Sequence, residues 1–110
     1  VQLLYHNTAN RINFRVTKNG SFQVNISDFT FEQTDNLKIA VKYKENDFAL
    51  WINGVERATD TSGQTFDANT LQKIQFNSGN GASDFFGKTK CVAVFNEALT
   101  DLELECLTKI

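Results

Sequence analysis

Residue types that usually restrict or staple a chain are scarce in this sequence. It contains no proline and no methionine, and it has one histidine and two cysteines in 110 residues. Without proline, the turns depend on Gly, Asn, Asp and Ser. Because no initiator methionine is present, we expect a fragment, a processed chain or a domain cut from a longer protein.

Histidine and cysteine are too few for most metal or redox sites. His6 has no second His or Cys at a spacing that binds zinc, so we interpret it as a loop residue and not as a zinc ligand or catalytic residue. Cys91 and Cys106 do not make a disulfide framework. They are either reduced core residues, since free cysteine is often buried as a small hydrophobe, or a pair. The cellular compartment therefore stays open.

Long apolar runs and charge of one sign are also missing. No apolar run approaches the roughly 20 residues that cross a bilayer. The formal net charge is −2, and Lys and Arg are scattered singly, so no basic stripe is available for a phosphate backbone. These absences argue against membrane insertion and against a nucleic-acid partner.

The composition is otherwise typical of a globular domain. Apolar residues make up 41% of the chain and ten of them are Phe, unlike the composition of a disordered segment. A chain of this length buries roughly 65% of its unfolded surface and needs no staple. We therefore expect residues 1–110 to form a single domain.

The central stretch, residues 36–56, has the pattern of two hairpins that share a strand. Alternating apolar and polar residues flank the polar break at 44–47. In the first run Leu37, Ile39, Val41 and Tyr43 share one face and Lys38, Ala40 and Lys42 the other; in the second run Phe48, Leu50 and Ile52 alternate with Ala49, Trp51 and Asn53. The Asn53-Gly54 pair suits a type I′ turn.

Further runs have strand-like patterns between turn signals. They are Val1 to Tyr5, Arg11 to Thr17, Phe22 to Ser27, Val55 to Ala58, Leu71 to Phe76 and Lys88 to Phe95. In two of them the alternation is regular: Ile12, Phe14 and Val16 against Arg11, Asn13, Arg15 and Thr17, and Phe22, Val24 and Ile26 against Gln23, Asn25 and Ser27. The turn at 18–21 joins these two runs into a hairpin.

The C-terminal end has the pattern of a helix. Thr100 followed by Glu103 forms a capping box, and Leu99 is placed to pack on Leu104 as a hydrophobic staple. We expect one helical face made of Leu102, Cys106 and Leu107. About seven short strands followed by one helix predict an all-β, antiparallel β-sandwich with a short C-terminal helix.

Three segments occur in an order that is specific for one fold. They are Leu50-Trp51-Ile52-Asn53-Gly54, Phe86-Gly87 and Ala98-Leu99-Thr100-Asp101-Leu102-Glu103-Leu104. In this order they resemble the C-terminal two-thirds of concanavalin A-like, laminin-G-like jelly-roll domains. The resemblance covers residues 37–108 well and residues 1–26 loosely. It implies a jelly-roll sandwich that is N-terminally incomplete or is completed by a neighbouring chain, because such domains are usually longer.

The resemblance also implies a function. Domains of this type are carbohydrate-binding or host-attachment modules of virion tail proteins and extracellular proteins, so we expect a glycan or cell-surface polysaccharide as partner. Glycosidases of the same class carry an E-x-D-x-x-E string on a strand, and no run here has one, so we expect no enzyme activity. The alternative is a structural domain, a homo-oligomer or part of a larger assembly, because an incomplete sandwich exposes a strand edge.

Trp51 is the first candidate site residue. If Leu50 and Ile52 face the core, Trp51 faces the other way. An exposed Trp51 would offer a flat platform to a sugar ring, with Lys42 and Asn53 nearby to bond its hydroxyls. The alternative is that a second sheet, or a part of the domain that this chain lacks, covers Trp51.

The polar loop at residues 77–84 is the second candidate site. Asn80 and Asp84 are placed there to contact a ligand, and Asp84 to bind Ca²⁺, which prefers six to eight oxygen ligands. Laminin-G-like relatives often bind calcium at an edge of the sandwich. No Asp-x-Asp string accompanies Asp84, so an ordinary solvated loop is the alternative.

Overall fold

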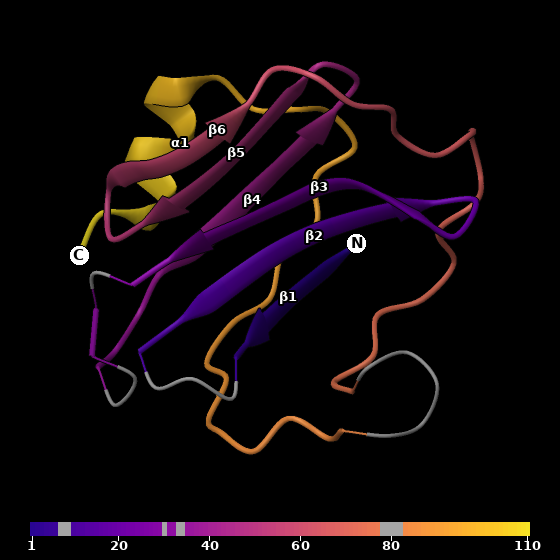
Figure 1. Ribbon diagram of the computed structural model, residues 1–110. Helices are drawn as coiled ribbons and strands as arrows, with labels where there is room; N and C mark the ends of the chain where they lie inside the picture. The colour runs from indigo at the N-terminus through magenta and orange to yellow at the C-terminus, as the bar shows by residue number, and fades with distance from the viewer. Residues whose placement is uncertain (7–9, 30, 33–34, 78–82) are drawn as a thin grey trace.

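Two stacked sheets and one helix make up the fold (Figure 1). The computed structural model describes residues 1–6, 10–29, 31–32, 35–77 and 83–110. Within these residues the elements are β1 (Gln2–Tyr5), β2 (Ile12–Lys18), β3 (Ser21–Asp28), β4 (Ile39–Lys44), β5 (Asp47–Ile52), β6 (Val55–Asp60) and α1 (Asp101–Thr108). The strand orders are β1-β2-β3 and β4-β5-β6, with every neighbouring pair antiparallel. The prediction of an antiparallel sandwich with a short C-terminal helix is confirmed.

Asn-Gly pairs close two of the hairpins. Asn19 and Gly20 have φ values of 51° and 76°, and Asn53 and Gly54 have values of 51° and 80°. A type I′ turn needs a positive φ at both central residues, which Asn and Gly tolerate best. The β2–β3 and β5–β6 hairpins therefore form where the sequence predicts them.

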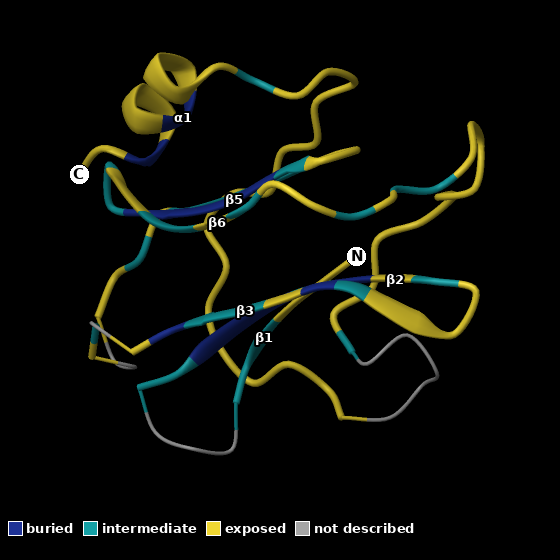
Figure 2. Cartoon of the chain, turned by 45° about the horizontal axis from the view of Figure 1, so that its top comes forward, coloured by how far each residue is buried: buried dark blue, intermediate teal, exposed yellow. Residues whose placement is uncertain are grey.

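The main core lies between the two sheets (Figure 2). Its buried residues come from the apolar faces of β2, β3 and β5: Ile12, Phe14, Val16, Val24, Phe48, Leu50 and Ile52. Phe66, from the loop after β6, is half-buried against them. Because Leu50 faces this core, its neighbour Trp51 faces the outside of its own sheet.

Contacts between β3 and β6 close one side of the sandwich. Arg57 Nε lies 3.3 Å from Asp28 Oδ2, and the Gln64 N–H donates to the Gln23 side-chain oxygen over 3.1 Å. Gly63 passes so close to β3 that a Cβ on it would lie 2.9 Å from the Gln23 carbonyl oxygen. The strands β1 and β4 are the remaining edge strands of the two sheets.

Helix α1 covers the outer face of the β4–β6 sheet (Figure 2). It begins with a capping box, in which the Glu103 N–H donates to the Thr100 hydroxyl and the Thr100 N–H donates to the Glu103 carboxylate over 2.8 Å. Leu99 packs against the small apolar cluster that contains Leu104. The predicted cap and staple are both confirmed. In the ranges that the structure describes, no helix has the length and apolar character to span a membrane.

The buried face of α1 differs from the predicted one. Leu104 and Thr108 are buried, whereas Leu102, Cys106 and Leu107 are exposed. The staple turns Leu104 toward the sheet, and residues two positions away, such as Leu102 and Cys106, then lie about 200° around the helix. The prediction was wrong because the side of the helix that meets the sheet carries Leu104 and Thr108, one turn apart, and not the side with the densest apolar spacing.

Two predicted strands do not form. Residues 71–76 and 88–95 contain no strand, and their large apolar side chains are exposed: Leu71, Ile74, Phe76, Val92, Val94 and Phe95. Alternation alone is not sufficient, because a strand needs a neighbour for its backbone hydrogen bonds. Cys91 lies in the second segment, and Cys91 and Cys106 are both free and exposed, so they neither pair nor belong to the core.

Candidate functional site

The sheet face that the sequence offers as a binding platform is covered. Trp51 faces away from the main core, as its alternation predicts, but only 6% of its surface is exposed. It is buried in one cluster with Ala49 and Leu104 of α1. The prediction of an exposed Trp51 is therefore wrong. The alternative of a covered side chain is right, although the cover is the C-terminal helix and not a second sheet.

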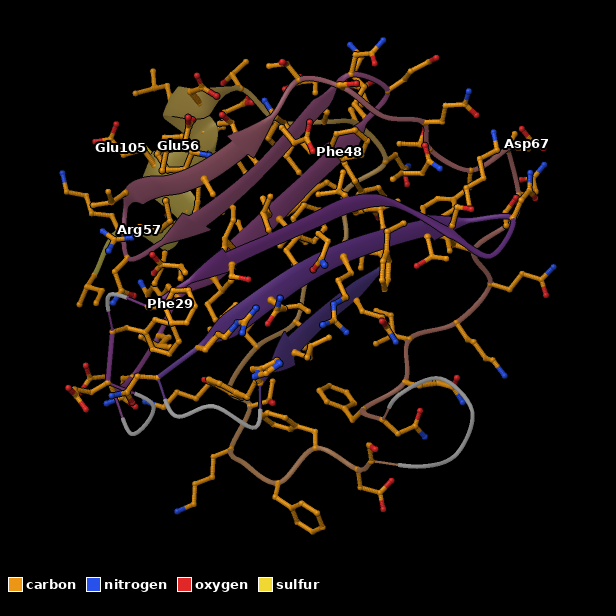
Figure 3. All side chains as sticks on the ribbon, viewed as in Figure 1. Phe29, Phe48, Glu56, Arg57, Asp67 and Glu105 are labelled. Atoms are coloured by element: carbon orange, nitrogen blue, oxygen red, sulfur yellow. The ribbon has the colours of Figure 1, made fainter. Side chains whose placement is uncertain are left out.

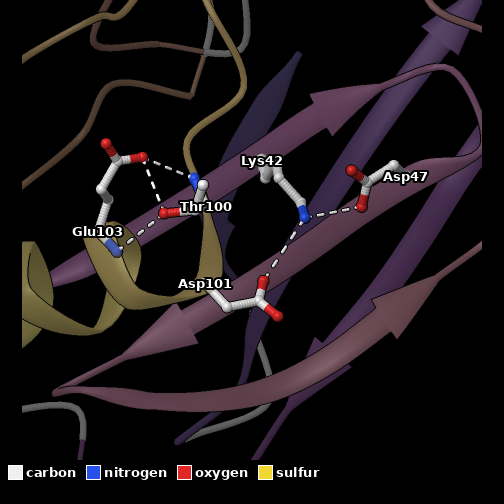
Figure 4. A network of polar contacts seen from close by, with 5 residues as sticks. All are labelled: Lys42, Asp47, Thr100, Asp101 and Glu103. Carbon is white, nitrogen blue, oxygen red and sulfur yellow. Dashed lines mark hydrogen bonds and ion pairs between the residues drawn. The ribbon is translucent and has the colours of Figure 1, made fainter.

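Lys42 lies on the same face and joins β4 to α1 (Figure 4). Its Nζ is 2.7 Å from Asp47 Oδ1 and 3.7 Å from Asp101 Oδ1. Asp101 belongs to the first turn of α1, where a carboxylate also favours the helix dipole. The ammonium group of Lys42 therefore helps to hold the helix on the sheet, and a ligand-binding role for Lys42 stays a prediction.

Asn53 has a structural role at the other end of this face. Its side-chain oxygen accepts from the Lys38 N–H over 2.9 Å, and its own N–H donates to the Lys38 carbonyl oxygen over 2.9 Å. The next residue, Gly54, donates its N–H to the Thr108 hydroxyl over 3.0 Å. These bonds tie the β5–β6 turn to the residue just before β4 and to α1.

The predicted loop site is not assembled by the described part of the chain. Asn80 lies outside the described residues. Asp84 is exposed, and the described ranges contain no group of three or more His, Cys, Asp or Glu residues that could hold a metal ion. A calcium site at Asp84 stays a prediction.

The outer face of the β1–β3 sheet carries an ordered polar array, and α1 lies on the other sheet (Figure 1). Arg11, Asn13 and Arg15 occupy alternate positions in and just before β2, opposite in direction to the apolar core residues between them, and Asn13 is itself buried. On β3, Ser27 is paired with Asn13 and Asn25 is paired with Arg15. We call these five residues the arginine face.

Hydrogen bonds between side chains order the arginine face. Asn13 Nδ2 donates to Ser27 Oγ over 2.8 Å and to Asn25 Oδ1 over 3.3 Å. Arg15 Nε donates to the same Asn25 oxygen over 3.2 Å, and Arg11 Nη2 donates to Ser27 Oγ over 3.3 Å. Each arginine is thus held by a residue of the neighbouring strand, and Asn13 links the two halves.

Two exposed phenylalanines lie against the guanidinium groups. Arg11 Cζ is 5.1 Å from the ring centroid of Phe29, which follows β3 (Figure 3), and Arg15 Cζ is 5.5 Å from that of Phe22. Phe29 and Phe22 are 57% and 58% exposed. A cation over an aromatic ring is attracted by the ring quadrupole. The contact restricts each guanidinium group.

A β-bulge places Phe22 on this face. Alternation with Val24 predicts that Phe22 points into the core. The register shifts after Val16, so that Val24 pairs with Val16 but Phe22 pairs with Thr17. The extra residue, Gln23, changes the side on which Phe22 emerges. The predicted inward direction of Phe22 is therefore wrong.

The arginine face has positive charge that no ion pair of the described residues neutralises. These ion pairs are Lys18–Asp67, Lys42–Asp47, Lys42–Asp101 and Arg57–Asp28. Desolvation, and then the charges of Arg11 and Arg15, lower the pKa of His6. Within the described residues, Asn13 Oδ1 and Arg11 Nε are buried without a hydrogen-bond partner. The face therefore has positive charge to spare, whereas these two buried atoms lie out of reach of a ligand.

A groove of about 470 Å³ beside the end of β4 is a second candidate site. It is lined by Tyr43, Lys44, Thr65, Asn96, Glu97 and Ala98. The Tyr43 ring meets the edge of Phe66, with centroids 6.3 Å apart. The buried polar atoms that lack a hydrogen-bond partner in the described residues all lie elsewhere, and none belongs to a residue that lines the groove. We therefore take the arginine face as the main candidate.

The sequence shows the arginine face only as the polar side of two predicted strands. Such a pattern is usually an ordinary solvated face. The available signal is the distribution of arginine: the chain has three, and Arg11 and Arg15 stand four residues apart on one side of one strand. The contributions of Phe22 and Phe29 depend on the bulge and on the loop after β3, which alternation does not predict.

Comparisons with known proteins agree with this architecture. The model of the concanavalin A-like lectin/glucanases superfamily matches residues 1–105, more than the part that the sequence motifs cover. The chain is also similar to the crystal structure of an S-layer domain-containing protein (residues 221–444) from Clostridium thermocellum, with a TM-score of 0.57 and 18% identity. The similarity covers 96% of this chain and 62% of that one. A search of curated proteins gives no match.

Proposed function

Since the chain belongs to the concanavalin A-like lectin/glucanases superfamily, we propose that it is a non-catalytic module that binds carbohydrate through the arginine face. We propose that the module is part of an extracellular or surface protein, such as a virion tail protein. The S-layer domain-containing protein of similar fold supports a surface setting. The observation that carries the proposal is the ordered array of amide, hydroxyl and guanidinium groups between Phe22 and Phe29, in which Asn25 is exposed, Arg11, Arg15 and Ser27 are half-buried, and Asn13 is buried beneath them.

The chemistry of the arginine face matches that of a sugar. Asn25, which is exposed, and Ser27, which is half-buried, present donors and acceptors for hydroxyl groups, and the two arginines add donors. Exposed aromatic rings supply apolar surface for the C–H face of a sugar ring. Because neighbouring strands already hold these side chains, a ligand has less side-chain entropy to overcome on binding.

The arginine face lacks the carboxylates of a glycosidase. Glycoside hydrolysis commonly needs two Asp or Glu residues that flank the scissile bond. Asp28 is the one carboxylate in β1, β2 and β3, and it pairs with Arg57 on the side of the sandwich where β6 lies. This arrangement favours binding over catalysis.

A glycan array probed with the 110-residue chain tests the proposal. We expect Asn25→Ala to abolish binding of the retained glycans, because the Asn25 oxygen accepts from both Asn13 and Arg15. Asn96→Ala, the same change in the groove beside Tyr43, should leave binding intact. Loss of binding with Asn96→Ala but not with Asn25→Ala would move the site to the groove. An array on which no glycan is retained would contradict carbohydrate binding.

A second candidate function is assembly through the open side of the sandwich. In the described residues between β6 and α1, eight large apolar side chains are exposed: Leu71, Ile74, Phe76, Phe85, Phe86, Val92, Val94 and Phe95. Phe85 stacks on Tyr5 of the edge strand β1, with ring centroids 6.2 Å apart. Apolar segments beside an edge strand favour pairing with further strands. We propose that strands of another chain complete this side in an assembly.

Light scattering at micromolar concentration tests the assembly. We expect an oligomer that dissociates when Val92 and Val94 are both replaced by Asp. Leu102→Asp, on the exposed side of α1, should leave the oligomer intact. A monomeric wild-type chain would contradict assembly with copies of itself, and it would not affect the proposal of glycan binding.

A further inference from the structure

We propose that the arginine face binds an anionic polysaccharide, with acidic groups of the polymer bound by Arg11 and Arg15. The inference rests on the proposed carbohydrate function and names its ligand class. It starts from the finding that two guanidinium groups are ordered on one sheet face and take part in no ion pair of the described residues.

Both guanidinium groups have N–H donors left for a ligand. A guanidinium group has five, and the side-chain hydrogen bonds of the arginine face use Nη2 of Arg11 and Nε of Arg15. Contacts with Phe29 and Phe22 hold the two groups. A carboxylate or sulfate accepts two parallel N–H bonds from such a group. The geometry is therefore suited to acidic groups.

The charge distribution favours an anion over a neutral sugar. The chain has 13 acidic and 11 basic residues, so it repels polyanions overall. Lys18, Lys42 and Arg57 are nevertheless the cations in the ion pairs of the described residues, which leaves Arg11 and Arg15 out. Two such arginines on one face create a local positive potential. An anionic ligand gains from this potential, whereas a neutral ligand does not.

The spacing of the arginines favours a polymer. Arg11 and Arg15 are four residues apart, which corresponds to about 13 Å along an extended strand. This backbone distance is longer than one sugar ring, so a polymer that lies along β2 can offer a different ring to each arginine. Between them, the exposed side chain of Asn25 can bond a hydroxyl group of the bound polymer.

Titration calorimetry with three polymers tests the inference. The probes are polygalacturonate, which carries carboxylates, dextran sulfate, which carries sulfates, and neutral dextran. We expect both anionic polymers to bind and dextran to bind at least about tenfold more weakly. The Arg11→Gln/Arg15→Gln variant should bind the anionic polymers at least about tenfold more weakly than wild type. Binding of polygalacturonate without dextran sulfate, or the reverse, would identify which acidic group the face selects.

Matched variants separate a built site from general attraction. Lys73→Gln/Lys90→Gln removes the same charge from exposed positions outside the strands and should keep full affinity. Arg11→Lys/Arg15→Lys keeps the charge but removes the planar fork, so its affinity should fall several-fold. Thermal unfolding curves that match wild type establish that each variant is folded.

The outcomes distinguish the inference from the function on which it rests. Equal binding of all three polymers, unchanged by Arg11→Gln/Arg15→Gln, would overturn the inference and leave carbohydrate binding standing. If Lys73→Gln/Lys90→Gln lost as much affinity for the anionic polymers as Arg11→Gln/Arg15→Gln, the inference would be overturned as well, because the attraction would then be a general effect of positive charge. Failure of all three polymers together with a glycan array that retains nothing would overturn both.

Discussion

Arg15 lies over the ring of Phe22, with its guanidinium carbon 5.5 Å from the ring centroid, on the outer face of the β1–β3 sheet. Phe22 reaches this face because the β2–β3 register shifts after Val16. A phenylalanine that is 58% exposed contributes little to a core. Its contact with Arg15 therefore points to a role in fixing the guanidinium group.

Replacement of Phe22 should weaken ligand binding more than folding. We expect Phe22→Ala to reduce the affinity for polygalacturonate several-fold, because Arg15 loses the ring that restricts it. The free energy of unfolding should change by less than about 0.5 kcal/mol, as for most exposed positions. Phe86→Ala, at a side chain that is 93% exposed, is the matched control and should change neither quantity. Equal affinities for wild type and Phe22→Ala would contradict the role of the ring.

Trp51 should behave as a core residue in urea unfolding. Trp51→Ala empties the space beneath α1, and we expect it to lower the free energy of unfolding by about 3–5 kcal/mol. Trp51→Phe should cost much less, because it retains a ring and removes an indole N–H that has no partner in the described residues. A stable Trp51→Ala variant that has lost glycan binding would show instead that Trp51 is a sugar platform.

We expect the burial of Trp51 to depend on pH through the cap of α1. Hydrogen bonds from the backbone N–H and then the hydroxyl of Thr100 lower the pKa of Glu103. A carboxyl group with a lowered pKa stabilises the fold above its unfolded pKa, and this contribution is lost as the pH falls through the folded pKa. We therefore expect α1 to loosen below about pH 4, with a red shift in the fluorescence of Trp51.

The control for this titration is Glu103→Gln. The amide oxygen can still accept from Thr100 but does not titrate, so the red shift between pH 5 and pH 3 should be smaller than in wild type. The same shift in both proteins would show that groups other than Glu103 cause the change.

The close approach of the loop after β6 to β3 should appear in a comparison of two glycines. Gly63 has a φ of 150°, and a Cβ on it would lie 2.9 Å from the Gln23 carbonyl oxygen. Gly20 has a φ of 76° and open space around it. We expect Gly20→Ala to cost about 1–2 kcal/mol for its backbone conformation alone, and Gly63→Ala to cost more, because the backbone must also shift. Thermal unfolding gives both values, and equal costs would mean that the loop yields freely.

Local signals predicted the elements whose partners are close in sequence. Asn19-Gly20 and Asn53-Gly54 fixed two hairpins, and Thr100 with Glu103 fixed the start of α1. Residues 71–76 and 88–95 have comparable strand patterns, but a strand also needs a neighbour, and a pattern carries no information about that neighbour. The direction in which the Trp51 side chain points was predictable too, because it follows from alternation with Leu50 and Ile52 in the same strand.

Features that depend on packing between distant elements were not predictable. The cover over Trp51 is Leu104, which is more than 50 residues away in the chain, and the rotation of α1 depends on its staple with Leu99. The sequence showed the arginine face only as alternating polar and apolar residues around Asn13. The ordering of its side chains comes from hydrogen bonds between β2 and β3. A one-residue bulge at Gln23 was enough to reverse the direction of Phe22.

The most direct test of the arginine face is an NMR titration of the ¹⁵N-labelled chain with short fragments of polygalacturonate. The account predicts that the largest shifts occur at residues 11–15 and 25–27 and at the side-chain amides of Asn13 and Asn25, while the indole signal of Trp51 does not move. Shifts concentrated at Tyr43 and Asn96, or at Trp51, would contradict the account and place the ligand in the groove or beneath α1.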